Sequence, residues 1–411
     1  MKKISKWLRE HYAKMISSIA FYPAIIAVFF LLLSVLMLKV DFSPAGKQFK
    51  QQLSWLSLKD ASTARSILTT IAGGIISLTV FSFSMVMIIL NQAASQMSNR
   101  ILNSMIENRF QQVVLGIYIG TIVYALFLLS TIRDISSGVY VPAISIYLLI
   151  LLTVIDIFLF IYFLDYVTQT VKFETIIKRV QMQTVKSMQK HYCLETQERI
   201  DEENQSFLVL PANESGYYQG FDQKRLLALA NRQELRFVMM NRKGTYLIKG
   251  ADLIRVYGSE RLSDDLKKEI YLSVVFFGGQ PIEQNPEYGF RQLAEVAIKA
   301  LSPGINDPAT AVLSINALSD LFAYRLNHCL PVRLKNEQGV VLIRQIVPTF
   351  KELFEDCIYP VWEYGKDDRY IRDALLHMLN QLEYQDKEMR HAKLFKKLHA
   401  QVLKSRIKTA V

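Results

Sequence analysis

The sequence has few cysteines and lacks the short motifs that mark common enzymes. Its 411 residues include 3 cysteines, an odd number at wide spacing (Cys193, Cys329 and Cys357), so no disulfide framework is predicted. The 6 histidines form no metal-ligand spacing with them. There is no Walker loop, no Gly-x-Ser-x-Gly elbow, no His-Glu-x-x-His pair and no dinucleotide fingerprint. We therefore expect a protein that is not an enzyme, with no catalytic residues, no metal and no cofactor.

Acidic residues are fewer than basic ones. The 48 lysines and arginines exceed the 37 aspartates and glutamates, which gives a net charge of +11. A basic total can serve nucleic-acid binding, but basic residues beside membrane helices also orient them and contact anionic lipid headgroups. The second explanation is favoured because apolar residues concentrate between Ile19 and Leu164. We expect the lipid bilayer as a partner and no nucleic acid.

Four long runs lack lysine and arginine altogether. They cover residues 19–38, 66–90, 113–132 and 139–164. A transmembrane helix needs about 20 mainly apolar residues, so each run is long enough to cross a bilayer. The first run is too long for the apolar part of a signal peptide and has no clear cleavage site after it. The sequence therefore predicts a transmembrane domain of residues 1–165 with four helical spans.

Basic clusters flank the first and the last span. They contain Lys2, Lys3, Lys6, Arg9 and Lys14 before the first span, and Lys172, Lys178, Arg179, Lys186 and Lys190 after the fourth. An even number of spans puts both clusters on one side, and the positive-inside tendency makes that side the cytoplasm. The loop after the first span opposes this orientation, because it carries Lys39, Lys47, Lys50, Lys59 and Arg65. We expect both termini in the cytoplasm, since the cysteine-poor second half has the composition of an intracellular domain.

The second half of the chain predicts a cytoplasmic α+β domain. An apolar stripe predicts a helical stalk at residues 166–204, which continues the fourth span. Turn residues separate short β-like runs in a β-rich subdomain at 205–285, where Asp222 caps a helix that reaches Asn231. Amphipathic helices predict a helical subdomain at 286–411, with a hairpin of Val332–Lys335 and Val340–Arg344. The β-like runs are Ser206–Leu210, Tyr217–Phe221, Arg236–Met240, Thr245–Lys249, Leu253–Tyr257 and Ile270–Phe277.

The second span carries a stripe of small and polar residues. Its members recur at three-, four- or seven-residue steps and so share one helical face: Thr70, Gly73, Ser77, Ser84 and Asn91. Small residues let helices approach closely and hydroxyls bond across helices, but such a stripe can equally line a water-filled path. The stripe therefore predicts either a packing face, within or between subunits, or a pore lining. The same helix is predicted to continue amphipathically from Asn91 to Arg109. In the third span, Gly116 and Gly120 form a pair typical of helix packing.

Asp156 lies inside the fourth span. An acid within the membrane is costly and usually faces a cavity or a partner, so it is a candidate functional residue. The alternative is an acid that is tolerated because nearby serine, threonine or tyrosine residues bond to it.

The segment Ser302-Pro303-Gly304-Ile305-Asn306-Asp307-Pro308 joins two amphipathic helices, Tyr288–Leu301 and Pro308–Asn327. Pro303 and Gly304 are expected to end the first helix, while Asn306 or Asp307 caps the second and Pro308 suits its first turn. Capping explains only one of the two side chains at 306 and 307 and leaves Ser302 unexplained. The segment is therefore either a helix joint alone or a contact with a ligand or a neighbouring subunit.

Several strings of the sequence resemble the bacterial family of predicted membrane proteins called Domain of Unknown Function 2254. The strings are Ser62–Arg65, Leu68–Gly74, Asn91–Gln96, Val114–Thr121, Gly216–Gln219, Tyr288–Leu293 and, most specific of all, Ala300–Pro308. The resemblance covers nearly the whole chain and implies a location in the bacterial inner membrane. It supplies no function and no role for Asp156.

Two functions of different kinds fit these observations. The leading hypothesis is a homo-oligomeric ion channel or pore, in which the second helices surround a path that the cytoplasmic domains gate or filter; ions are then candidate partners. The alternative is a membrane-anchored sensor or scaffold that binds a small ligand or a protein near Ser302–Pro308. An enzyme with an unrecognised site is a third and weaker hypothesis.

Overall fold

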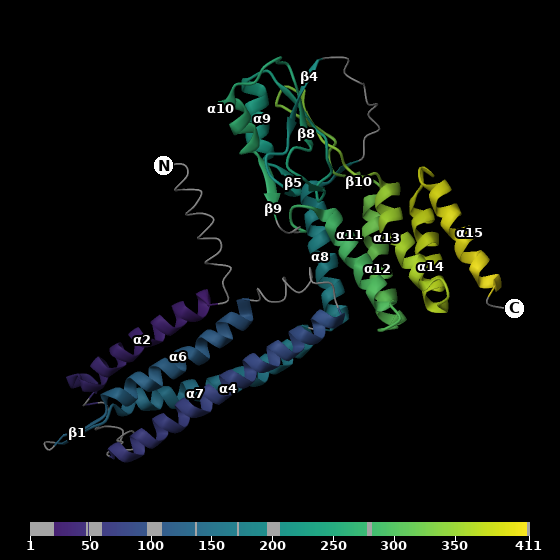
Figure 1. Cartoon of the computed structure of the whole chain (residues 1–411). Coiled ribbons are helices and arrows are strands. Elements are labelled where there is room, and N and C mark those ends of the chain that lie inside the picture. The colour runs from purple at the N-terminus through teal and green to yellow at the C-terminus, as the bar shows by residue number, and fades with distance from the viewer. Residues whose placement is uncertain are drawn as a thin grey trace. The chain divides into compact units, whose positions relative to one another are not determined.

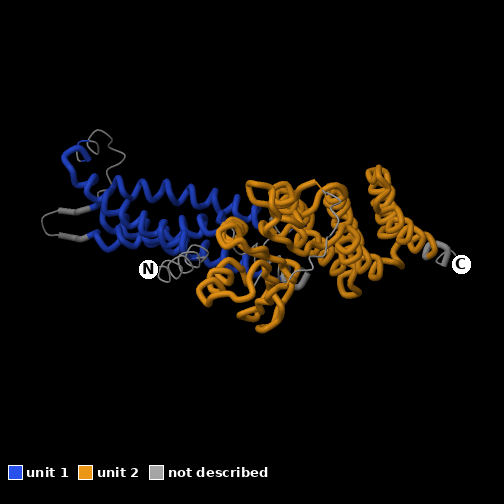
Figure 2. The backbone as a smooth tube through the Cα atoms, turned by 90° about the horizontal axis from the view of Figure 1, so that it is seen from above, with its two compact units in different colours: residues 1–172 blue, residues 173–411 orange. Residues whose placement is uncertain are grey.

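Two compact units make up the chain, Met1–Lys172 and Phe173–Val411 (Figure 2). The computed structural model describes residues 20–46, 48, 60–96, 109–135, 138–170, 172–194, 206–277 and 282–408. The division falls between helices α7 and α8, later than the predicted boundary at residue 165.

Long apolar helices form the N-terminal unit. They are α2 (Phe21–Phe42), α4 (Ala61–Gln96), α6 (Arg109–Thr131) and α7 (Ala143–Thr170), which lie side by side (Figure 1). Within the described residues, 4 helices of 22 to 29 residues and mean hydropathy 2.1 to 2.8 are long and apolar enough to cross a membrane. These are the four spans that the sequence predicts. Of the predicted continuation of α4 to Arg109, residues 97–108 lie outside the described residues.

The fourth span begins later than predicted. Residues 138–140 form strand β2 (Gly138–Tyr140), which pairs antiparallel with β1 (Arg133–Ile135), and the helix starts only at Ala143. Pro142 explains the difference, because a proline disfavours helical backbone at the residue before it. The apolar run through Val141 therefore belongs to a hairpin and not to the helix.

Glycines bring α2 and α6 together. A Cβ on Gly116 would lie 2.7 Å from Cδ1 of Ile26, and one on Gly120 would lie 2.7 Å from Cγ of Phe30. Both side chains belong to α2, so the glycine pair is used for packing within one protomer.

Asp41 ties the end of α2 to the start of α7. Its side chain is fully buried and accepts hydrogen bonds from the backbone N–H groups of Ile144 (3.2 Å) and Ser145 (2.8 Å) and from the Ser145 hydroxyl (2.6 Å). The first N–H groups of a helix have no partner inside the helix, and the positive end of the helix dipole attracts a carboxylate. The buried acid is thus supplied with donors.

Two sheets form the β-rich part of the C-terminal unit. One has the strand order β11-β12-β6-β8-β4 and the other β7-β5-β9; all neighbours are antiparallel except β12 and β6. The strands are β4 (Phe207–Pro211), β5 (Gly216–Phe221), β6 (Arg236–Met239), β7 (Tyr246–Leu247), β8 (Asp252–Tyr257), β9 (Val274–Phe277), β11 (Arg333–Lys335) and β12 (Val341–Arg344). The larger sheet therefore takes two strands from the region predicted as the helical subdomain.

Most local predictions in this part are confirmed. Helix α9 (Gln223–Arg232) follows Asp222, whose side chain accepts a hydrogen bond from Arg225 N, and β11 and β12 form the predicted hairpin. The strand predicted at Ile270–Phe277 is wrong in its first half, because helix α10 (Asp264–Tyr271) precedes β9. Ser263 caps that helix by accepting from Leu266 N at 3.2 Å.

Helices make up the rest of the C-terminal unit. They are α8 (Phe173–His191), α11 (Pro286–Ala300), α12 (Pro308–Arg325), α13 (Phe350–Gly365), α14 (Arg369–Gln385) and α15 (Ala392–Lys408), and β3 (Cys193–Leu194) pairs with β10 (His328–Cys329). The predicted stalk is thus a separate helix, α8, which packs against α11 and α12. Phe322 lies at the centre of an aromatic core with Phe290, Phe350 and Phe354.

Gly289 sets the distance between α8 and α11. A Cβ at this position would overlap the hydroxyl of the buried Thr184 on α8. Gly304, by contrast, has no atom within 4 Å of the position of a Cβ. Gly289 and Gly304 therefore form a matched pair for a steric test.

We expect Gly289→Ala to destabilise the protein by about 1–3 kcal/mol, since an added methyl must push the two helices apart. Gly304→Ala should change stability little, because nothing obstructs its methyl. Thermal unfolding of the full chain in detergent would measure both. Equal melting temperatures for the two variants would contradict the proposed contact.

Candidate functional site

The small and polar stripe of α4 points away from the other described helices of the N-terminal unit. Thr70, Gly73, Ser77, Ser84 and Asn91 are all exposed. The buried face of the helix lies on the opposite side and consists of Ala61, Ala64, Leu68, Ala72, Ile75 and Ser82. No atom lies within 4 Å of a Cβ placed on Gly73 or on Gly74. The stripe is therefore not a packing face among the described helices, and it is open to lipid, to a second copy of the chain or to a water-filled path.

A second feature of the N-terminal unit is a group of hydroxyls around Asp156. This side chain is fully buried in α7, and the hydroxyl of Thr121 on α6 lies beside it. Tyr118, one turn earlier on α6, is close enough to interact electrostatically with Asp156, and the hydroxyl of Ser82 on α4 lies beside that of Tyr118. We call these four residues the Asp156 cluster.

The Asp156 cluster is poorly satisfied by hydrogen bonds. Among the described residues, neither carboxylate oxygen of Asp156 has a hydrogen-bond partner, and the same holds for the hydroxyls of Ser82 and Tyr118. The hydroxyl of Thr121 lies 3.1 Å from the carbonyl of Ile117 and also within reach of the Asp156 carboxylate, so one proton is shared between two acceptors. The cluster thus places one carboxylate beside three hydroxyl groups that do not fully satisfy it.

The C-terminal unit holds a second buried acid, Glu287, in the first turn of α11. The side chain is 4% exposed, and its Oε1 and the Oδ1 of Asn285 have no hydrogen-bond partner among the described residues. Burial raises the pKa of Glu287 to about 7 from its ordinary value of 4.5, although the positive charges of Arg325, Arg291, Lys243 and Arg242 act in the opposite direction. The carboxyl group can therefore exchange a proton near neutral pH.

Arg325 is the most deeply buried of these cations, at 1% exposure. It donates to the carbonyls of His328 and Pro348, each at 2.9 Å, and its guanidinium lies 5.7 Å from the ring centre of Tyr192. Arg242 and Arg291 have other acidic partners, Glu352 at 2.5 Å and Asp356 at 3.7 Å.

Lys243 and His191 also border this cluster. Burial lowers the pKa of Lys243, against the attraction of Glu287, and burial is likewise the main cause that lowers the pKa of His191. Several groups with shifted pKa values thus gather around Glu287, which is typical of a proton-exchange or ligand site. The sequence analysis did not single out these residues, although Glu287 directly precedes the string Tyr288–Leu293. They come from distant segments, so no spacing along the chain marks them.

The segment Ser302–Pro308 is a helix joint held by local hydrogen bonds. Asp307 caps α12 by accepting from Thr310 N at 3.1 Å and from its hydroxyl at 2.5 Å. Asn306 has a φ of 49°, in the left-handed region that asparagine tolerates, and the Ser302 hydroxyl donates to the carbonyl of Lys299 at 2.7 Å. Pro308 occupies the first turn of α12, while Pro303 and Gly304 are exposed. The side chains of Ser302 and Asp307 and the backbone of Asn306 therefore have roles within the joint, and a ligand or subunit contact stays a prediction.

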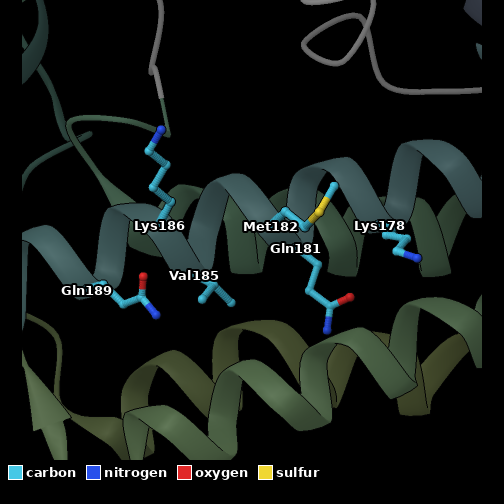
Figure 3. Close-up of a pocket in the computed structure, with 6 residues that line it drawn as sticks. All are labelled: Lys178, Gln181, Met182, Val185, Lys186 and Gln189. Carbon is cyan, nitrogen blue, oxygen red and sulfur yellow. The ribbon is translucent and has the colours of Figure 1, made fainter.

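A groove of about 570 Å³ runs along α8 and is lined by residues of that helix alone: Lys178, Gln181, Met182, Val185, Lys186 and Gln189 (Figure 3). Gln181 points toward α12, where it donates to Asp320 at 2.7 Å, whereas Lys186 points the other way (Figure 3). Because its polar groups do not converge, the groove is a weaker ligand site than the Glu287 cluster.

Comparisons with known proteins find relatives of no stated function. A family model described as "Predicted membrane protein (DUF2254)" matches residues 16–381. Proteins described as uncharacterized, from Mycobacterium bovis and from Mycobacterium tuberculosis, are 25% identical over 330 residues, which is 77% of this chain. The chain spans 63% of the length of these curated relatives. No solved structure matches.

The raised pKa of Glu287 predicts a pH-dependent stability. A group whose pKa is higher in the folded state stabilises the fold below its unfolded pKa and loses that contribution as pH rises through the folded value. Between pH 4.5 and about 7, the wild type should therefore lose up to roughly 3 kcal/mol relative to Glu287→Gln, which keeps a neutral side chain. Thermal unfolding of both proteins at pH 5 and pH 8 measures this difference. Glu283→Gln, at an exposed position, is the control. Parallel pH profiles for wild type and Glu287→Gln would refute the prediction.

The helix joint makes a separate prediction. Asp307→Ala should cost about 0.5–2 kcal/mol of stability through the lost cap. Asn306→Ala should also destabilise, whereas Asn306→Gly should be tolerated because glycine accepts a positive φ. Melting temperature and oligomer size of the purified variants would be compared. If the variants melt normally but assemble or function differently, the segment is a contact site and not a joint alone.

Proposed function

The chain belongs to the DUF2254 family of predicted membrane proteins, and we propose that it forms a homo-oligomeric channel or pore. The α4 helices of several copies surround the path, and the C-terminal units gate or filter it. Ions are the proposed permeant species, and the proposal includes no enzymatic activity. The observation that carries it is the exposed stripe of α4, with Thr70, Gly73, Ser77 and Ser84 on the side opposite the buried face.

The two kinds of glycine in the N-terminal unit support this assignment. Gly116 and Gly120 meet α2 inside the protomer, whereas Gly73 and Gly74 meet nothing. A glycine in a helix costs stability relative to alanine, so a pair without an internal contact calls for an external reason. Close approach of a second copy, or a wide and polar path, supplies one.

The hydroxyls of the stripe are compatible with both lipid and water. Ser77 donates to the carbonyl of Gly73 at 3.0 Å, which satisfies its proton wherever it faces. Asn91 cannot satisfy its amide in this way, and its exposed side chain favours a polar environment at that end of the stripe. A path lined by α4 provides such an environment.

We further propose a location in the bacterial inner membrane with both termini in the cytoplasm. Lys172, Lys178, Arg179, Lys186 and Lys190 follow α7 closely, as the positive-inside tendency expects of a cytoplasmic segment. The matching cluster at residues 2–14 lies outside the described residues. A reporter fused after Val411 should be active only in the cytoplasm, and export of that reporter would contradict the orientation.

A membrane-anchored sensor is the second candidate function. It is favoured by the Glu287 cluster, where buried polar atoms without hydrogen-bond partners are what a small polar ligand would satisfy. A sensor of this kind would bind its ligand in the C-terminal unit and conduct nothing.

The channel proposal predicts discrete conductance from purified protein in planar bilayers. Ser77→Leu and Ser84→Leu should each reduce the single-channel current severalfold, because a bulky apolar side chain would narrow and dehydrate the path. Val154→Leu, at an exposed position of α7 outside the stripe, is the matched control. If the variants keep normal currents but their oligomer dissociates, the stripe is a packing face. If the wild-type protein conducts under no condition, the sensor is favoured.

A further inference from the structure

The Asp156 cluster brings oxygen atoms from three helices to one buried point. Asp156 belongs to α7, Tyr118 and Thr121 belong to α6, and Ser82 belongs to α4. Asp156, Tyr118 and Thr121 are 0% exposed and Ser82 is 3% exposed. Each lies close to another member, yet the carboxylate oxygens and the hydroxyls of Ser82 and Tyr118 make no hydrogen bond among the described residues. Groups that converge without bonding to one another are what surrounds a shared ligand.

The charge of Asp156 has no partner within the spans. No lysine, arginine or histidine occurs in residues 66–90, 113–131 or 143–170. Asp41 shows how the same unit treats a buried acid that is structural, since three donors at the start of α7 bond to it. Asp156 receives no comparable donors. A counter-charge from outside the chain is therefore needed to keep the carboxylate ionised in an apolar surround.

We propose that the Asp156 cluster binds a dehydrated monovalent cation, of which Na⁺ is the probe of choice. Carboxylate and hydroxyl oxygens are the ligands that hard cations prefer, and one carboxylate balances one positive charge. A single acid makes a divalent ion a poor fit, because such ions usually draw on more carboxylates or on phosphates. In this arrangement, Asp156 supplies the charge and Tyr118, Thr121 and Ser82 supply neutral oxygen ligands.

This site goes beyond the proposed pore and does not depend on it. Ser82 lies on the buried face of α4, whereas Ser77 and Ser84 lie on the exposed face. The cation is therefore held inside one protomer, away from any path between copies. Binding can be measured on purified protein whether or not the protein conducts.

The test uses the full chain in detergent with Na⁺ alone as the ligand. Binding of radioactive ²²Na⁺ should saturate at one ion per protomer. The temperature of thermal unfolding should shift upward when NaCl replaces N-methylglucamine chloride at constant ionic strength, because an ion bound only to the folded state stabilises it.

Asp156→Asn keeps the shape and removes the charge, so it should weaken binding roughly tenfold or more and abolish the shift. Tyr118→Phe and Ser82→Ala should weaken binding less. Asp165→Asn, at an exposed position near the end of α7, is the matched control and should bind as the wild type does.

Three outcomes would overturn the proposal. If the wild-type protein binds no ²²Na⁺ and its melting temperature does not depend on the cation, no ion occupies the cluster, and a proton on Asp156 is the alternative. Binding that survives in Asp156→Asn lies at another site. Equal weakening in Asp165→Asn would mean that charge alone, and not the cluster, attracts the ion. Should Asp156→Asn fail to fold, wild-type binding together with Tyr118→Phe still decides the question. A current that is lost in Ser77→Leu while ²²Na⁺ binding persists would separate the pore from this site.

Discussion

A carboxylate that is removed from water is stable only when donors, a proton or a counter-charge compensate it, and the two units of this protein answer that constraint in different ways. Asp41 receives the free N–H groups at the start of α7. Glu287 is surrounded by cations and has a pKa near neutrality, at about 7. Asp156 lies beside hydroxyl groups alone and has no basic neighbour in residues 66–90, 113–131 or 143–170. The first acid is therefore part of the scaffold, whereas the other two keep carboxylate oxygens without a hydrogen-bond partner among the described residues.

The described helices of the N-terminal unit differ in how closely their faces are packed. The α2–α6 contact uses both glycines of its pair, and every buried residue of α4 lies on the side away from the stripe. One protomer thus fills its own interior and leaves one face of α4 with small and polar groups. That exposed face is the feature on which the proposed association of copies rests.

The sequence predicted features that depend on neighbouring residues and missed those that depend on distant ones. Hydropathy placed all four spans, and turn residues placed the hairpin of β11 and β12, because both follow from local composition. The run at Ile270–Phe277 was misassigned as a strand throughout. Its first residues are the apolar end of the helix that Ser263 caps, and their composition resembles that of a strand. The stripe of α4 could be read because its members share one helix. Asp156 could be noticed alone, but its companions Tyr118, Thr121 and Ser82 could not, because only the packing of three helices brings them together. The parallel pairing of β12 with β6 and the cations around Glu287 escaped for the same reason.

The contact between α2 and α6 has an evolutionary consequence. Phe30 fills the space above Gly120, and Ile26 and the backbone of Pro23 fill the space above Gly116, so a larger residue at either glycine requires a shift in α2. The facing positions of the two helices are therefore expected to change together. Across homologous sequences, a larger residue at either glycine should coincide with a smaller one on α2, and this correlated variation would record the helix pairing without any structure.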